Sequence, residues 1–221
     1  MLDATSYISA LTRRLLQRFG ARLVYVGLQG SHLRGEATED SDIDVMVVLD
    51  TLVPEDMAAY RAIVEELPAP EKSCGFLCGK DDLARWNPLE MAHLAHTTRD
   101  CYGRLAPLLP PHTQEDVRRY VLLSAGNLYH ELCHRRVHQG DEASDEALPG
   151  CYRQAFFILQ NLHYLETGVF ALTRAQLTPR LTDRDRDVMV EDQRLRAGEE
   201  PDPDRSFALL YAWCQDVLRR A

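Results

Sequence analysis

Two aspartates separated by one residue, Asp42 and Asp44, stand where a run of β-branched and apolar residues begins. That run extends from Ile43 to Leu49 and predicts a buried β-strand. Because side chains alternate along a strand, both carboxylates should lie on one face. Neighbouring carboxylates repel each other, and a bound divalent cation explains such a pair most simply. Oxygen ligands suit Mg²⁺ that bridges nucleotide phosphates, so we predict that both aspartates are catalytic metal ligands.

A Gly-Ser pair, Gly30 and Ser31, follows the preceding apolar run, which extends from Val24 to Leu28. We expect this run to be a short strand that is broken at Gly27. Glycine lets the backbone approach a phosphate closely, and Ser31 adds a hydroxyl and an amide N–H at the start of a loop or helix. Together with the aspartates, the pair predicts a site for a nucleoside triphosphate.

The segment from Gly30 to Asp44, GSHLRGEATEDSDID, resembles the signature of the minimal nucleotidyltransferases in the DNA polymerase β-like superfamily. Leu33 departs from the signature, because the family often has a smaller residue there. The resemblance implies ATP as the nucleotide and Mg²⁺ as the metal, and it adds Arg34 and Ser41 to the nucleotide-binding residues. Two plainer interpretations stay open: an acidic turn that enters a buried strand, and an exposed Arg34 that forms a salt bridge.

The resemblance also implies a third carboxylate on the strand beside the aspartate strand. The segment expected to form that strand, from Glu71 to Cys78, has no acid at its centre. Glu71 is the best candidate, because Asp81 and Asp82 follow Gly79 and are more simply a polar turn with a helix cap. If only two carboxylates are present, the group that activates the acceptor must come from elsewhere.

The second half of the chain has helical periodicity, and Pro107, Pro110 and Pro111 mark a break before it. We therefore predict an α+β fold: residues 1–106 form a nucleotidyltransferase domain with a small mixed sheet flanked by helices, and residues 112–221 form a helical bundle. We expect the acidic segment DEASDE, after Gly140, to be a loop between two bundle helices. The arrangement resembles aminoglycoside-type nucleotidyltransferases, which implies that the bundle binds the acceptor.

Three histidines, His130, His134 and His138, recur at every fourth position and should share one helical face. Such spacing occurs in zinc sites, although no Glu-x-x-His pattern or distant acid accompanies it. The face could equally be polar and solvated, or it could line an acceptor pocket. In the last case Glu131 or a histidine would accept the hydroxyl proton, and we name Glu131 as a candidate catalytic residue.

Composition narrows the classes of partner. A formal net charge of -9 argues against binding to long nucleic acid, which needs a basic surface. No apolar run approaches the ~20 residues of a membrane helix, so we expect no membrane association. The N-terminal segment predicts an amphipathic helix with no cleavable apolar core. The six cysteines lack paired spacing and should be reduced thiols, so we expect a cytoplasmic protein.

The sequence thus predicts a Mg²⁺-dependent enzyme that transfers a nucleotidyl group, most simply from ATP, to a hydroxyl of a small molecule or protein and releases pyrophosphate. The competing hypothesis is a catalytically weak, nucleotide-binding regulator of the antitoxin type associated with helical HEPN proteins. The ribonuclease motif of HEPN proteins, an Arg followed by His after four to six residues, does not occur in the predicted bundle helices. Neither hypothesis identifies the acceptor.

Overall fold

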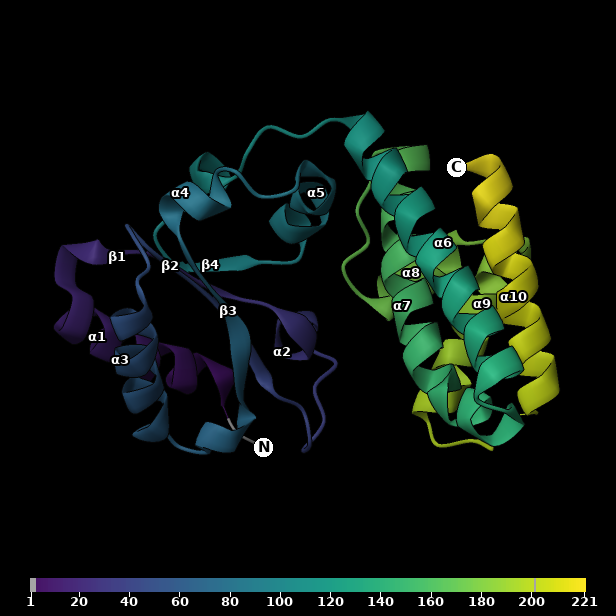
Figure 1. Cartoon of the computed structure of the whole chain (residues 1–221), viewed down its shortest axis with the longest axis horizontal. Helices are drawn as coiled ribbons and strands as arrows, with labels where there is room; N and C mark the ends of the chain where they lie inside the picture. The colour runs from purple at the N-terminus through teal and green to yellow at the C-terminus, as the bar shows by residue number, and fades with distance from the viewer. Residues whose placement is uncertain (1–2, 201) are drawn as a thin grey trace. The chain divides into compact units, whose positions relative to one another are not determined.

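The computed structural model describes residues 3–200 and 202–221, and the chain divides into two compact units at His112 and Thr113. The N-terminal unit contains the strands and the C-terminal unit is helical (Figure 1). The fold is α+β, as the sequence predicts.

Within the described residues, the N-terminal unit has one four-stranded sheet with the order β3-β2-β1-β4. Strands β1 (Leu23–Leu28) and β2 (Ile43–Leu49) are antiparallel, and β3 (Ser73–Gly79) runs parallel to β2. The short edge strand β4 (Arg99–Tyr102) is antiparallel to β1 and was not expected from the sequence. The mixed sheet brings the start of β3 beside the start of β2.

Gly27 does not break β1, contrary to our expectation. It lies inside the strand and pairs with Met46 of β2. A Cβ atom at Gly27 would lie only 2.3 Å from the hydroxyl oxygen of Tyr25, because the Tyr25 ring covers this position. The glycine therefore makes room for a neighbouring aromatic side chain.

Helices cover both faces of the sheet (Figure 1). Helices α1 (Ala4–Phe19) and α3 (Pro54–Glu65) lie on one face, where Leu11 and Leu15 pack against Ile43 and Val45 of β2. On the other face, Met46 and Val48 belong to a second cluster, together with apolar side chains from α4 (Lys80–Leu83) and α5 (Pro88–His96). Burial on both faces makes β2 an almost continuous apolar strand after Asp44.

The C-terminal unit is a bundle of α6 (Gln114–His138), α7 (Asp141–Thr167), α9 (Asp183–Arg196) and α10 (Pro203–Arg220), with a short α8 (Arg174–Leu177). Helix α6 packs against α7 and α10, and α9 packs against the same two helices. The core contains Leu128, Phe156, Met189 and Trp213, which are fully buried.

The acidic segment after Gly140 is helical, so the predicted loop is wrong. Gly140, with a φ angle of 85°, is the last residue of the short link between α6 and α7. Helix α7 begins directly after it, at Asp141. Acidic residues in a first helical turn interact favourably with the unpaired N–H groups there. The charge pattern that suggested a solvated loop thus fits a helix start.

The remaining short elements are α2 (Gly30–Arg34) and the 3-10 turns η1 (Gly20–Arg22), η2 (Pro70–Lys72), η3 (Ala106–Leu108) and η4 (Thr178–Arg180). Within residues 3–200 and 202–221, no helix combines the length and the apolar character that crossing a membrane requires.

Candidate nucleotide site

Gly30 lies directly against the carboxylate of Asp44. A Cβ atom at Gly30 would lie 1.8 Å from Asp44 Oδ2, and its φ angle of 68° is one that L-residues rarely adopt. The neighbouring Gln29 N–H donates to the Asp44 carbonyl oxygen at 2.8 Å, which ties the turn before α2 to β2. Only glycine satisfies both the conformation and the space at this position.

Asp44 also has a neighbour on β3. In the parallel register of β2 and β3, Asp44 lies opposite Cys74. The Asp44 carboxylate interacts electrostatically with the Cys74 thiol, and the Asp42 carboxylate does so more weakly. Partial burial and the Asp44 carboxylate together raise the pKa of the Cys74 thiol above its usual value. Both aspartates therefore lie at the start of β2 beside one protonated thiol.

The next residue, Gly75, holds β3 close to β2. Its φ angle is 148°, and a Cβ atom there would lie 2.0 Å from the Val45 carbonyl oxygen. A larger residue would push the two strands apart, because the obstacle is backbone. Gly75 thereby keeps Cys74 next to Asp44.

We expected the neighbouring strand to provide a carboxylate, and its sequence, SCGFLCG, contains none. Glu71 lies outside the strand, in the turn η2, and is exposed. Cys74 was not predicted as a neighbour of the aspartates. The sequence contains no local signal for this pairing, because the parallel register that aligns Ile43 with Ser73 places Asp44 beside Cys74.

Two of the residues assigned to nucleotide binding have partners within their own loop. Arg34 Nε forms an ion pair with Glu36 Oε2 at 3.2 Å, and both side chains are largely buried. The Ser41 hydroxyl oxygen accepts a hydrogen bond from the Thr38 N–H at 2.9 Å. These contacts shape the segment between α2 and β2. Ser31 lies half-buried in the first turn of α2, beside Gly30.

In the bundle, both carboxylate oxygens of Glu131 have partners. Oε1 accepts from Arg135 Nε at 3.0 Å, and Oε2 accepts from Gln154 Nε2 at 2.9 Å. His130 and His134, on either side of Glu131 in the sequence, are exposed. The carboxylate has the contacts of a residue that links α6 to α7.

The aspartate pair could hold a magnesium ion. Neither Asp42 nor Asp44 forms an ion pair with a basic residue in the described part of the chain. Among these residues there is also no group of three or more His, Cys, Asp or Glu side chains arranged to bind a metal. Two carboxylates are a sufficient protein contribution for Mg²⁺, which commonly keeps water and substrate phosphate as its other ligands. The oxygen chemistry of the pair therefore fits this ion.

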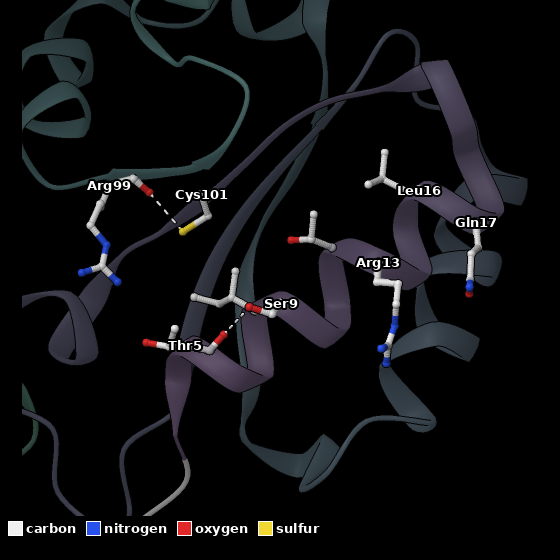
Figure 2. Close-up of a pocket in the computed structure, with 9 residues that line it drawn as sticks. Thr5, Ser9, Arg13, Leu16, Gln17, Arg99 and Cys101 are labelled. Atoms are coloured by element: carbon white, nitrogen blue, oxygen red, sulfur yellow. Dashed lines mark hydrogen bonds between the residues drawn. The ribbon is translucent and has the colours of Figure 1, made fainter.

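A hollow of about 710 Å³ lies elsewhere in the N-terminal unit, between α1 and β4. Figure 2 shows Ser9, Arg13 and Leu16 on the helix and Arg99 and Cys101 on the strand. None of the residues of the Gly30–Asp44 segment lines it. The hollow is therefore separate from the aspartate pair.

A mixed sheet with a Gly-Ser turn against paired aspartates on the next strand defines a nucleotidyl-transfer domain. Comparison with known families agrees with this class. Residues 8–76, which lie in the N-terminal unit, match the family model described as the nucleotidyltransferase domain. The match covers β1, α2, β2 and most of β3, including Cys74.

Two relatives are informative. The protein adenylyltransferase MntA of Thermococcus cleftensis (strain DSM 27260 / KACC 17922 / CL1) is 48% identical over 45 residues, which are 20% of this chain and 43% of the relative. The chain thus matches less than half the length of that protein. The crystal structure of spectinomycin adenyltransferase AAD(9) from Enterococcus faecialis, with ATP and spectinomycin, has a TM-score of 0.58 and 14% identity. The structural match covers 99% of this chain and 100% of the AAD(9) chain, so the two proteins share a fold over both units.

Proposed function

We propose that this protein is a nucleotidyltransferase that transfers the AMP group of ATP to a hydroxyl of a small molecule or protein, with Mg²⁺. The observation that carries the proposal is the contact between Gly30 and the Asp44 carboxylate, with Asp42 alongside at the start of β2. A glycine turn packed on a carboxylate leaves room for phosphate close to a metal ligand.

In the proposed reaction, the acceptor oxygen forms a bond with the α-phosphorus of ATP. The bond from that phosphorus to the β-phosphate oxygen breaks, and pyrophosphate leaves. Asp42 and Asp44 would hold Mg²⁺, which supplies positive charge that stabilises the transferring phosphoryl group. Gly30 and Ser31 would bind the β- and γ-phosphates through backbone N–H groups and the Ser31 hydroxyl, which orients the α-phosphorus for in-line attack.

The other assigned residues take supporting roles in this proposal. Arg34 would balance phosphate charge while Glu36 holds its guanidinium in place. Ser41 would keep the loop before Asp42 in shape through its bond to Thr38. Glu131 and Glu71 are the candidates for the group that receives the proton of the acceptor hydroxyl.

The choice of ATP and of the acceptor follows the relatives. The AAD(9) structure contains ATP and spectinomycin, and the MntA relative is named a protein adenylyltransferase. A small hydroxylated acceptor accords with the shared two-unit fold. A fold alone does not specify a substrate, so the acceptor class must be tested directly.

A second candidate, a catalytically weak nucleotide-binding regulator, has a specific observation in its favour. Beside Asp44, β3 offers the thiol of Cys74 and no carboxylate. A protonated thiol is a poor acceptor for the proton of an attacking hydroxyl. Nucleotide binding requires the Gly-Ser turn and the two aspartates but no proton acceptor. It would therefore persist in a protein that transfers poorly.

The experiment is a transfer assay with α-labelled ATP and Mg²⁺, against a panel of aminocyclitols, aminoglycosides and candidate protein acceptors. We expect label on one acceptor class with the wild type and none with the Asp42→Asn/Asp44→Asn double variant. Asp81→Asn, which changes an exposed acid on α4, is the matched control and should retain transfer.

A thermal-shift measurement separates the two candidates. Stabilisation by ATP that depends on Mg²⁺ and on the two aspartates, without labelled product, would favour the regulator. Absence of any Mg²⁺-dependent shift by ATP in the wild type would refute both candidates.

A further inference from the structure

Helix α6 of the C-terminal unit carries an exposed row of three histidines near its C-terminal end. His130, His134 and His138 all lie on the surface, and His138 is the last residue of the helix. In the part of the chain that the structure describes, no hydrogen bond or ion pair joins these imidazoles to another residue. Their contacts are with one another, ring against ring. Their ring nitrogens are accessible to a ligand.

The two neighbouring pairs differ in spacing. The ring centroids of His134 and His138 lie 4.9 Å apart with an interplanar angle of 44°, whereas those of His130 and His134 lie 5.9 Å apart. A zinc–nitrogen bond is about 2.0–2.1 Å long, so an imidazole centroid lies roughly 3.2 Å from a bound ion. Two imidazoles on one tetrahedral ion then have centroids about 5.2 Å apart. The centroid distance between His134 and His138 is close to this value. His130 and His134 are too far apart to bind one ion unless a side chain rotates.

The charges around the pair also permit a cation. Arg135 is paired with Glu131 at 3.0 Å, and Arg136 is paired with Asp141 at 2.8 Å. Neither arginine is therefore an uncompensated positive charge beside the imidazoles. The C-terminal end of a helix carries partial negative charge on its unpaired carbonyl groups, which favours a bound cation at His138.

We propose that His134 and His138 chelate one divalent transition-metal ion of the Zn²⁺ or Ni²⁺ type. Imidazole nitrogen suits these ions, whereas Mg²⁺ prefers oxygen, so this site and the aspartate pair would select different metals. No third His, Cys, Asp or Glu side chain among the described residues completes the site. Water occupies the remaining coordination positions in the isolated chain.

The test is a calorimetric titration of the full chain with Zn²⁺. It uses the Asp42→Asn/Asp44→Asn background, with excess Mg²⁺ present, so that the aspartate pair does not contribute. We expect one ion per chain, and a loss of affinity of at least about 10-fold when either His134→Ala or His138→Ala removes one arm of the chelate. His130→Ala is the matched control on the same helix face and should change the affinity by less than about twofold.

The outcomes are decisive in either direction. Absence of stoichiometric binding, or an affinity unchanged by His134→Ala, would overturn the proposal. An equal loss of Zn²⁺ affinity in His130→Ala would overturn the assignment of the site to His134 and His138. All three side chains are exposed, so circular dichroism should show the same helical content for each variant. Transfer activity is not a readout here, and the result is independent of the proposed enzymatic function.

Discussion

Gly30 and Asp44 are in contact so close that a single added methyl group at Gly30 would overlap the carboxylate, at 1.8 Å from Oδ2. The two residues belong to different elements, α2 and β2. Their contact brings a backbone able to approach phosphate next to a side chain able to hold a metal. This relationship gives the proposed site its most direct test.

Gly30→Ala should abolish the Mg²⁺-dependent stabilisation by ATP, because the methyl group displaces the Asp44 carboxylate. Gly35→Ala is the matched control, since Gly35 has nearly the same φ angle, 69°, and nothing within 4 Å of its Cβ position. Both variants should lose about 1–2 kcal/mol of stability from the left-handed backbone. Only Gly30→Ala should lose the ATP response in a thermal-shift assay. Equal ATP responses in the two variants would show that the contact with Asp44 is irrelevant to binding.

Cys74→Glu should increase nucleotidyl transfer, because it places a proton-accepting carboxylate beside Asp44 on β3. General-base catalysis contributes roughly 10²–10⁴-fold in enzymes, so an increase of at least about 10-fold is expected if the wild type lacks a base on this strand. The measurement is the initial rate with α-labelled ATP. Cys74→Gln, similar in size but neutral, should give no increase. A fall in rate with Cys74→Glu would indicate that the thiol itself is required.

Glu131→Gln tests whether the bundle carboxylate accepts the acceptor proton. If it does, transfer should fall by about 10²–10⁴-fold while the Mg²⁺-dependent ATP shift is unchanged. Arg135→Met breaks the same ion pair from the other side and keeps the carboxylate, so it should retain transfer. Because both partners are about one third exposed, each variant should lose only about 0.2–1 kcal/mol of stability. Similar rates in the two variants would assign Glu131 a structural role alone.

His163 should make the stability of the bundle depend on pH. Its side chain is 6% exposed, its Nε2 has no hydrogen-bond partner among the described residues, and burial lowers the pKa of the imidazole below its usual value. The unfolded chain therefore binds a proton at a higher pH than the folded chain does. Stability from this group is present above the unfolded pKa of about 6.5 and is lost as the pH falls from there towards the folded pKa.

Urea unfolding at neutral pH and at pH about 5 measures this effect, and His163→Gln should reduce the loss between the two conditions. A wild-type loss that persists in full in His163→Gln would assign the pH dependence to other groups.

The sequence by itself determined the local parts of this protein. The spacing from Gly30 to Asp44 and the apolar run after it predict the turn and the strand that the structure contains. Helical periodicity identified the second half of the chain as a helical bundle, because a repeat near 3.6 residues is a property of consecutive residues. Gly140 and the acidic segment after it were misread, since a helix start and a solvated loop use the same residue types.

Only the tertiary structure decided which residues meet across the chain. The neighbour of Asp44 is Cys74, which follows from the parallel register of β2 and β3 and from the close backbone approach at Gly75. Edge strand β4 is too short to have a pattern of its own and is defined by its pairing with β1. The three histidines are evenly spaced in the sequence, but their ring centroids are 5.9 Å apart for His130 and His134 and 4.9 Å apart for His134 and His138. The distances differ because side-chain rotamers set the separation between rings. Pairings of this kind depend on packing between distant segments, which a local pattern does not contain.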